Sequence, residues 1–245
     1  MPGIFRLIFL ALVAFIAAML AAVTGFGGAA VLLPMLALVF GVREAIPILT
    51  VAQLIGNASR VWFNRHELDW KVVAWFALGG IPTALVGGML FARAPLAALT
   101  RVLGGFLILI VIWRHMPHTS NWKPPLESFA AIGAGSSFLS ALLGSVGPLM
   151  APFFLAYGLV KGAYIGTEAL STVVMHVAKL IAYRESAILP LHSVLMGLAL
   201  GPIMIAGSFA GKRVVDKLPE RVFVLVIDLT LLAAGVLFIG GWTKL

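Results

Sequence analysis

The stretch TGFGGAAVLLPMLALVFGVREA, residues 24–45, has a counterpart in the second half of the chain, LGSVGPLMAPFFLAYGLVKGA, residues 143–163. Each copy holds a glycine-rich turn, then a short apolar run containing a proline, then a second turn with a basic residue. GGIPTALVGG at 79–88 is likewise echoed by LGPIMIAGS at 200–208, and the offset stays between 117 and 120. An ordered series of matches at a nearly constant offset indicates an internal repeat.

The composition is typical of a membrane protein. Of the 245 residues, 62% are hydrophobic and 11% are charged, whereas soluble domains carry about 25% charged residues. Several apolar stretches approach or exceed the roughly 20 residues that a helix needs to cross a bilayer. Basic residues account for the net charge of +8 and lie mainly in short loops, which favours a topology signal over nucleic-acid binding.

We therefore predict an all-α, polytopic membrane protein with 8–10 transmembrane helices in two tandem repeats of about 120 residues. The first transmembrane repeat is 1–116, a polar linker is 117–125, and the second transmembrane repeat is 126–245; together they form one integral membrane domain. The expected helical segments are 4–23, 28–40, 45–63, 69–91, 96–113, 126–143, 147–157, 164–183, 190–211 and 221–240.

The second segment of each repeat is too short for a full span, which is typical of broken or re-entrant helices. If all ten segments cross, each repeat has an odd number of crossings and the two repeats are inverted. Ten of the 17 Lys and Arg residues then share one side. The tendency of basic residues to stay inside therefore favours inverted repeats with both termini outside.

The glycine-rich turns are predicted to break a helix within the membrane. The turn residues assigned to a binding site are Thr24, Gly25, Gly27 and Gly28 in the first repeat, and Ser145 and Gly147 in the second. In one interpretation the glycines serve close helix packing. In the other, each break leaves free N–H groups and the positive end of a helix dipole, which suit an anion. Broken helices at matching positions in two repeats are the best sequence indication of a transporter's binding site.

Two polar stripes with the same i, i+4, i+7 spacing lie one repeat apart. Their members are Gln53, Asn57 and Arg60, and Thr172, His176 and Lys179. Each stripe shares one helix face and ends in a cation. A single buried histidine is more commonly structural, and a lysine near a span end commonly reaches for the interface. The agreement between the repeats favours a shared site for an oxyanion.

Two acidic residues, Glu168 and Asp228, lie in apolar segments and have no acidic counterpart in the first repeat. Pairing of Glu168 with Lys179 or His176 is the simpler expectation, and proton coupling through Glu168 or Asp228 is the alternative. The sequence has no cysteine and none of the hydrolase or metalloprotease motifs. We therefore predict no enzyme activity, no catalytic residues, no cofactor and no metal site.

The TGFGG and PMLALVFG motifs, their repeat with GSVGP and APFFLAYGLVKGA, and the terminal VLFIGG resemble the sulfite exporter TauE/SafE family, also called TSUP or DUF81. The resemblance covers nearly the whole chain. It implies an inner-membrane carrier of small sulfur-containing anions, such as sulfite, sulfoacetate or other sulfonates. The second repeat departs from the usual glycine-rich form, since it has SVGP where the first repeat has GFGG.

We accordingly expect a multi-pass secondary transporter of such anions in the cell inner membrane, working by alternating access. The alternatives are an anion channel, a carrier for a different small carboxylate or oxyanion, and a membrane assembly protein that transports nothing. The expected partners are the small anion and membrane lipid, with no nucleic acid, and a homodimer is left open.

Overall fold

The computed structural model describes residues 2–25, 28–115 and 123–214, together with 229, 232, 235, 236, 239 and 240. Every regular element in this part of the chain is a helix, which confirms the predicted all-α fold. The helices are α1 Pro2–Thr24, α2 Gly28–Phe40, α3 Val42–Phe63, α4 Trp70–Arg93, α5 Leu96–His115, α6 Ser128–Leu143, α7 Gly147–Tyr157, α8 Lys161–Glu185 and α9 Leu191–Val214.

These bounds follow the expected segments closely. The main difference is that α3 and α8 each begin three residues earlier than predicted. The last expected segment, 221–240, lies outside the described residues except for helical positions at 229, 232, 235, 236 and 239 and a turn at 240, and Asp228 lies outside them as well. A Cβ at Gly235 would lie 2.9 Å from the Gly104 carbonyl oxygen, so this part of the chain packs closely on α5.

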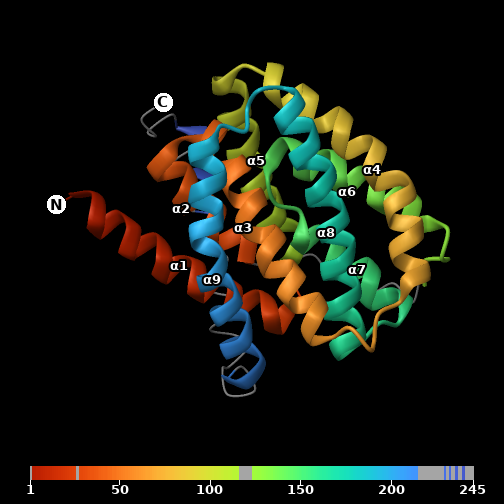
Figure 1. Ribbon diagram of the computed structural model, residues 1–245. Helices are drawn as coiled ribbons and strands as arrows, with labels where there is room; N and C mark the ends of the chain where they lie inside the picture. The colour runs from red at the N-terminus through yellow and green to blue at the C-terminus, as the bar shows by residue number, and fades with distance from the viewer. Residues whose placement is uncertain are drawn as a thin grey trace.

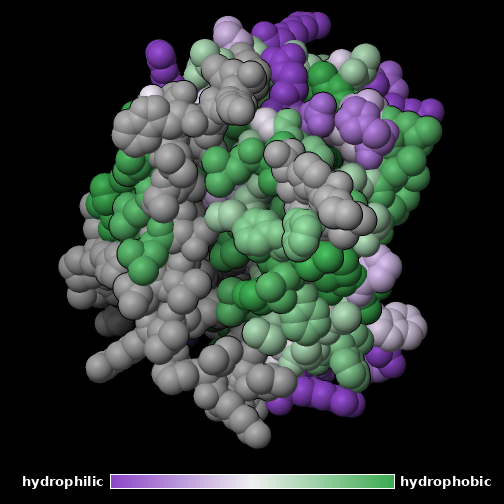
Figure 2. Space-filling model, turned by 90° about the vertical axis from the view of Figure 1, so that its left-hand side faces the viewer, coloured by the Kyte–Doolittle hydropathy of each residue, from purple (hydrophilic) through white to green (hydrophobic). Residues whose placement is uncertain are grey.

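One face of the molecule is apolar across its middle. Figure 2 shows hydrophobic side chains spread over the centre of one face and hydrophilic side chains gathered at its two ends. Three segments of the described chain are long and apolar enough to cross a membrane: Trp70–Arg93, Lys161–Glu185 and Leu191–Arg213. Shorter apolar helical segments are Leu7–Ala22, Gly28–Phe40, Ala97–Leu109 and Ser128–Leu143. An apolar belt of this kind is the surface that lipid requires.

The packing of the helices repeats between the two halves of the chain (Figure 1). Several contacts between helices of the two halves have a counterpart between the equivalent helices. α4 packs on α6 as α1 packs on α9, and α4 packs on α8 as α3 packs on α9. The equivalent helices α3 and α8 pack against each other at the centre. Each half is thus completed by a helix of the other half, so neither half has its full packing surface alone.

The central pair α3 and α8 runs antiparallel. Near the end of α3, Asn64 lies against Gly166 at the start of α8. Toward the other end, Thr50 of α3 interacts with Tyr183 of α8. An inverted repeat requires its equivalent central helices to run in opposite directions, whereas a parallel repeat requires the same direction. The antiparallel central pair fits an inverted repeat, and the inversion of the two repeats stays a prediction.

The repeat is also visible in the backbone. Among the described residues, the glycines with positive φ are Gly25 at 76° and Gly144 at 84°, and Gly41 at 78° and Gly158 at 109°. The first pair ends α1 and α6, and the second pair follows α2 and α7. Only glycine adopts this conformation at little cost. A glycine at the equivalent position of each repeat therefore specifies both helix breaks.

Glycines also bring α4 and α6 into backbone contact. A Cβ on Gly133 would lie 2.2 Å from the Phe76 carbonyl oxygen, and a Cβ on Gly79 would lie 1.9 Å from that of Ala130. Small residues that let two backbones approach are the usual means of helix association in a membrane. The sequence interpretation did not cover this helix pair, because it concerned the glycine-rich turns; there, a Cβ on Gly28 would lie 2.8 Å from the Ala17 carbonyl oxygen.

We expect Gly133→Ala to lower the apparent melting temperature of the detergent-solubilised protein by several degrees, because the new methyl group collides with backbone that cannot move freely. Gly135→Ala, two residues further along α6, is the matched control, since nothing lies within 4 Å of its Cβ position. Equal melting temperatures for the two variants would contradict this close packing.

Candidate functional site

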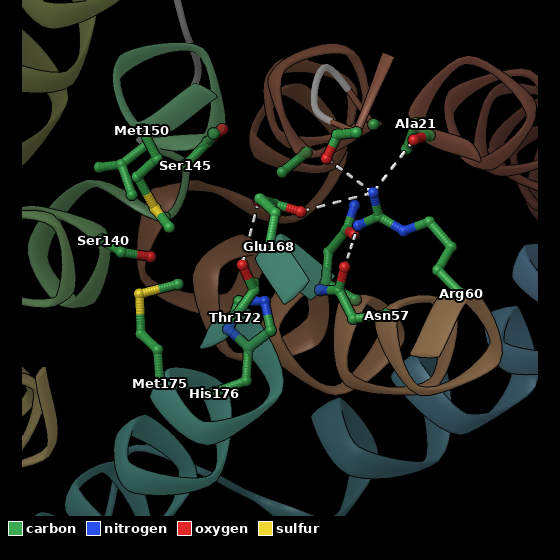
Figure 3. A pocket seen from close by; sticks show the side chains of 17 residues that line it. Ala21, Asn57, Arg60, Ser140, Ser145, Met150, Glu168, Thr172, Met175 and His176 are labelled. Carbon is green, nitrogen blue, oxygen red and sulfur yellow. Dashed lines mark hydrogen bonds and ion pairs between the residues drawn. The ribbon is translucent and has the colours of Figure 1, made fainter. Parts of the chain in front are cut away.

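A small cavity lies where the two helix breaks meet the central pair α3 and α8. Its volume is about 30 Å³, which is room for roughly one or two water molecules. The breaks contribute the end of α1 and the start of α2 from one half, and the end of α6 and the start of α7 from the other (Figure 3). The cavity is thus built from corresponding elements of both halves.

Most residues of the predicted site line this cavity. They are Gly25, Gly28, Gln53, Asn57, Arg60, Ser145, Gly147, Thr172 and His176, and Glu168 lies among them. Thr24 is the last residue of α1, and the position of its side chain is not described. Gly27 lies outside the described residues. The two polar stripes therefore face one shared space, apart from Lys179.

Arg60 closes the end of α1. Its Nη1 donates to the carbonyl oxygens of Ala21 at 3.0 Å and Gly25 at 2.7 Å, and its Nη2 donates to Oδ1 of Asn57. The side chain is only 5% exposed. The Ala21 carbonyl also accepts from the Gly25 N–H at 3.0 Å, so Arg60 is its second donor. The C-terminal end of a helix carries a partial negative charge, which matches a buried guanidinium.

Glu168 pairs with Arg60, and this corrects the expected pairing with Lys179 or His176. Oε2 of Glu168 lies 3.7 Å from Nη1 of Arg60, and Oε1 accepts a hydrogen bond of 3.1 Å from Thr172 Oγ1. Figure 3 shows the carboxylate directed across the cavity toward α3. The reason is the antiparallel packing of α3 and α8, which brings the start of one stripe opposite the end of the other.

Lys179 lies behind the cavity and does not line it. The side chain is fully buried, and its Nζ donates to Oγ of Ser140 near the end of α6 at 3.1 Å. Ser140 occupies the position in the second half that Ala21 occupies in the first, at the repeat offset. Each stripe cation therefore lies beside the end of the helix that precedes the break.

Four polar atoms that line the cavity lack a hydrogen-bond partner within the described part of the chain. They are Nε2 of Gln53, Oγ of Ser145, Nδ1 of His176 and Oε2 of Glu168. All four residues are at most 3% exposed. An unsatisfied buried polar group costs about 1–3 kcal/mol. Such groups gathered around one space indicate a place where a polar ligand or water completes the hydrogen bonding.

Sequence reasoning missed the rest of the lining. The additional residues are Ala21, Ala29, Ser140, Gly144, Val146, Met150 and Met175. Ser140 could have been found from the repeat, because it lies one helical turn before Gly144 as Ala21 lies one turn before Gly25. Met150 and Met175 carry no chemical signal in an apolar sequence, so only their packing identifies them.

We expect Arg60→Met to lower the melting temperature strongly, because removing one member of a buried ion pair costs about 3–5 kcal/mol. Adding Glu168→Gln to that variant should recover part of the loss, because no unpaired carboxylate then remains. Arg65→Met is the control, since Arg65 is exposed at the same end of α3. If the decrease in melting temperature of the double variant equalled the sum of the decreases of the two single variants, Arg60 and Glu168 would not be coupled.

Comparison with known proteins assigns the chain to a family. A family model described as sulfite exporter TauE/SafE matches residues 10–238, which is nearly the whole chain. No curated protein and no solved structure matches the chain. The match confirms the resemblance seen in the glycine-rich motifs, and it spans both halves and both helix breaks. The chain belongs to the sulfite exporter TauE/SafE family of membrane transporters.

Proposed function

We propose that this protein is a secondary transporter of small sulfur-containing oxyanions, such as sulfite or an organic sulfonate, and that these anions bind in the central cavity. The observation that carries the proposal is that polar atoms of Gln53, Ser145 and His176 line one small space and have no hydrogen-bond partner in the described part of the chain. The amide and the hydroxyl are donors, and the imidazole becomes one when Nδ1 holds a proton.

The surroundings of these groups favour an anion with several oxygens. The starts of α2 and α7 both reach the cavity, at Gly28 and Gly147, and helix starts direct N–H groups and positive dipole ends at a ligand. The three unpartnered groups come from α3, the turn before α7, and α8. A tetrahedral or pyramidal oxyanion can accept hydrogen bonds from several directions at once, as this arrangement needs.

The small size of the cavity and its position between the two halves support an alternating-access mechanism. Both halves of the chain supply its walls, and its volume of about 30 Å³ leaves little room for an anion unless the described walls move apart. A ligand therefore enters or leaves only when one part of the molecule moves against another. Each half packs on a helix of the other half in an equivalent way. The corresponding movement of either half would open the cavity to one side of the membrane.

We expect Gln53→Leu and His176→Leu each to reduce uptake of radiolabelled sulfite or sulfoacetate into proteoliposomes by roughly tenfold or more, because a hydrogen bond to a charged group contributes about 1.5–3 kcal/mol. Ala58→Leu and Val177→Leu are matched controls on the exposed faces of the same helices. Their uptake should equal that of the unaltered protein.

Uptake by Gln53→Leu and His176→Leu at the unaltered rate would contradict the site. Saturable uptake with counterflow identifies a carrier, whereas conductance without saturation would identify a channel. Competition by unlabelled thiosulfate, taurine or small carboxylates then ranks the substrates. Preference for a carboxylate would contradict the substrate class while leaving the site in place.

Glu168 is the acidic residue among those that line the cavity, so it is our candidate for proton coupling. A carboxylate beside Arg60 repels an entering anion, and protonation removes that repulsion. We expect an inward proton gradient to accelerate sulfite uptake by the unaltered protein several-fold and to leave uptake by Glu168→Gln unchanged. A Glu168→Gln variant that still responds to the gradient would exclude Glu168 as the coupling residue.

A further inference from the structure

We infer that a second pocket beside the central cavity is a cytoplasm-facing vestibule for the anion, and that the Arg60 side chain is the gate between the two. The inference rests on the proposed function and deepens it, since it names the route by which the anion reaches the site. The pocket has a volume of about 350 Å³. Its lining is Ala22, Arg60, Phe63, Asn64, Glu67, Lys161, Gly162, Ile165, Ser208, Gly211 and Lys212.

Arg60 is the residue that the vestibule and the central cavity share. Its guanidinium is held by the Ala21 and Gly25 carbonyls on one side and by Asn57 and Glu168 on the other. These contacts join α1, α3 and α8 across the boundary between the two spaces. Rotation of one side chain away from them would therefore connect the vestibule with the cavity.

The chemistry of the vestibule suits an anion. Lys161 and Lys212 contribute two ammonium groups, and Glu67 contributes one carboxylate. Nζ of Lys212 donates to the Phe63 carbonyl oxygen at 3.1 Å, which leaves further N–H donors on the same group. A recess with an excess of positive charge raises the local concentration of small anions.

The vestibule lies at the more basic end of the molecule. The described basic side chains at this end, beyond Arg60, are Arg65, Lys71, Lys123, Lys161, Lys212 and Arg213, and those at the opposite end are Arg43, Arg93, Arg101 and Arg184. Basic residues are enriched in the cytoplasmic loops of membrane proteins. The vestibule therefore faces the cytoplasm, which is the side from which an exporter takes its substrate.

The opposite boundary of the cavity is closed differently. At the equivalent break, a Cβ on Gly144 would touch the side chains of Leu33 and Ile46 at 3.0–3.3 Å, and Lys179 is buried against Ser140. Apolar packing and a buried lysine lie on that side, whereas the pocket of about 350 Å³ lies on the Arg60 side. Movement of the Arg60 side chain would therefore open the central cavity toward the vestibule.

The absence of cysteine from the chain makes a direct accessibility test available. Asn64→Cys places a thiol in the vestibule and Ser145→Cys places one in the cavity. Each variant is treated with the membrane-impermeant anionic reagent methanethiosulfonate ethylsulfonate, applied separately to right-side-out and inside-out vesicles. We expect Asn64→Cys to react rapidly from the cytoplasmic side and Ser145→Cys to react slowly from either side.

Opening the gate should then expose the cavity from one side. Combined with Arg60→Ala, the Ser145→Cys thiol should react at least tenfold faster from the cytoplasmic side and at an unchanged rate from the other side. Glu168→Gln serves as a second gate variant that keeps the arginine and removes its ionic partner. Unchanged rates in a folded gate variant, or acceleration from the opposite side, would overturn the inference.

The thiol of Asn64→Cys also tests the charge of the vestibule. At Asn64→Cys, the anionic reagent should react several-fold faster than its cationic trimethylammonium analogue, and Lys161→Gln with Lys212→Gln should remove the difference. Lys71→Gln, an exposed lysine at the same end, is the control that should leave it in place. Equal rates for both reagents before these substitutions would contradict an anion vestibule. Because labelling requires no sulfite transport, failure of the substrate assignment and failure of the gate are distinguishable.

Discussion

The site depends on how this protein stabilises the ends of helices that stop inside the membrane. A helix that stops there leaves backbone carbonyls without partners, and lipid supplies none. At the end of α1, Arg60 donates hydrogen bonds to the carbonyl oxygens of Ala21 and Gly25. Lys179 lies at the equivalent place beside the end of α6. After these two helix ends, the chain restarts as α2 and α7, and the starts of both helices line one shared space.

This arrangement separates two kinds of polar residue that look alike in the sequence. Arg60 donates to carbonyls at the end of α1, and Lys179 donates to the Ser140 hydroxyl near the end of α6. Polar atoms of Gln53, Ser145 and His176 instead line the cavity without hydrogen-bond partners in the described part of the chain. The ion pair of Arg60 with Glu168 adds a contact that an anion or a proton can disturb, and it places the gate and the coupling residue together.

The sequence predicted the fold and most of the cavity lining because the information is local and repeated. Glycine at the helix breaks, proline in the short helices and the i, i+4, i+7 stripes each recur at one offset, and the structure has the breaks and stripes at those places. The contact between Arg60 and Glu168 could not be predicted, because it depends on the antiparallel crossing of two helices that lie a whole repeat apart in sequence. The same crossing explains why Lys179 lies behind the cavity although it completes a stripe.

The location of a bound anion tests most directly whether the central cavity is the binding site. Crystals of the protein grown with selenite, a close analogue of sulfite, would show the ligand by the anomalous scattering of selenium. We expect a selenium peak in the central cavity, within hydrogen-bond distance of Gln53, Ser145 and His176. No peak in the cavity at saturating selenite, or a peak only at a different place in the molecule, would contradict it.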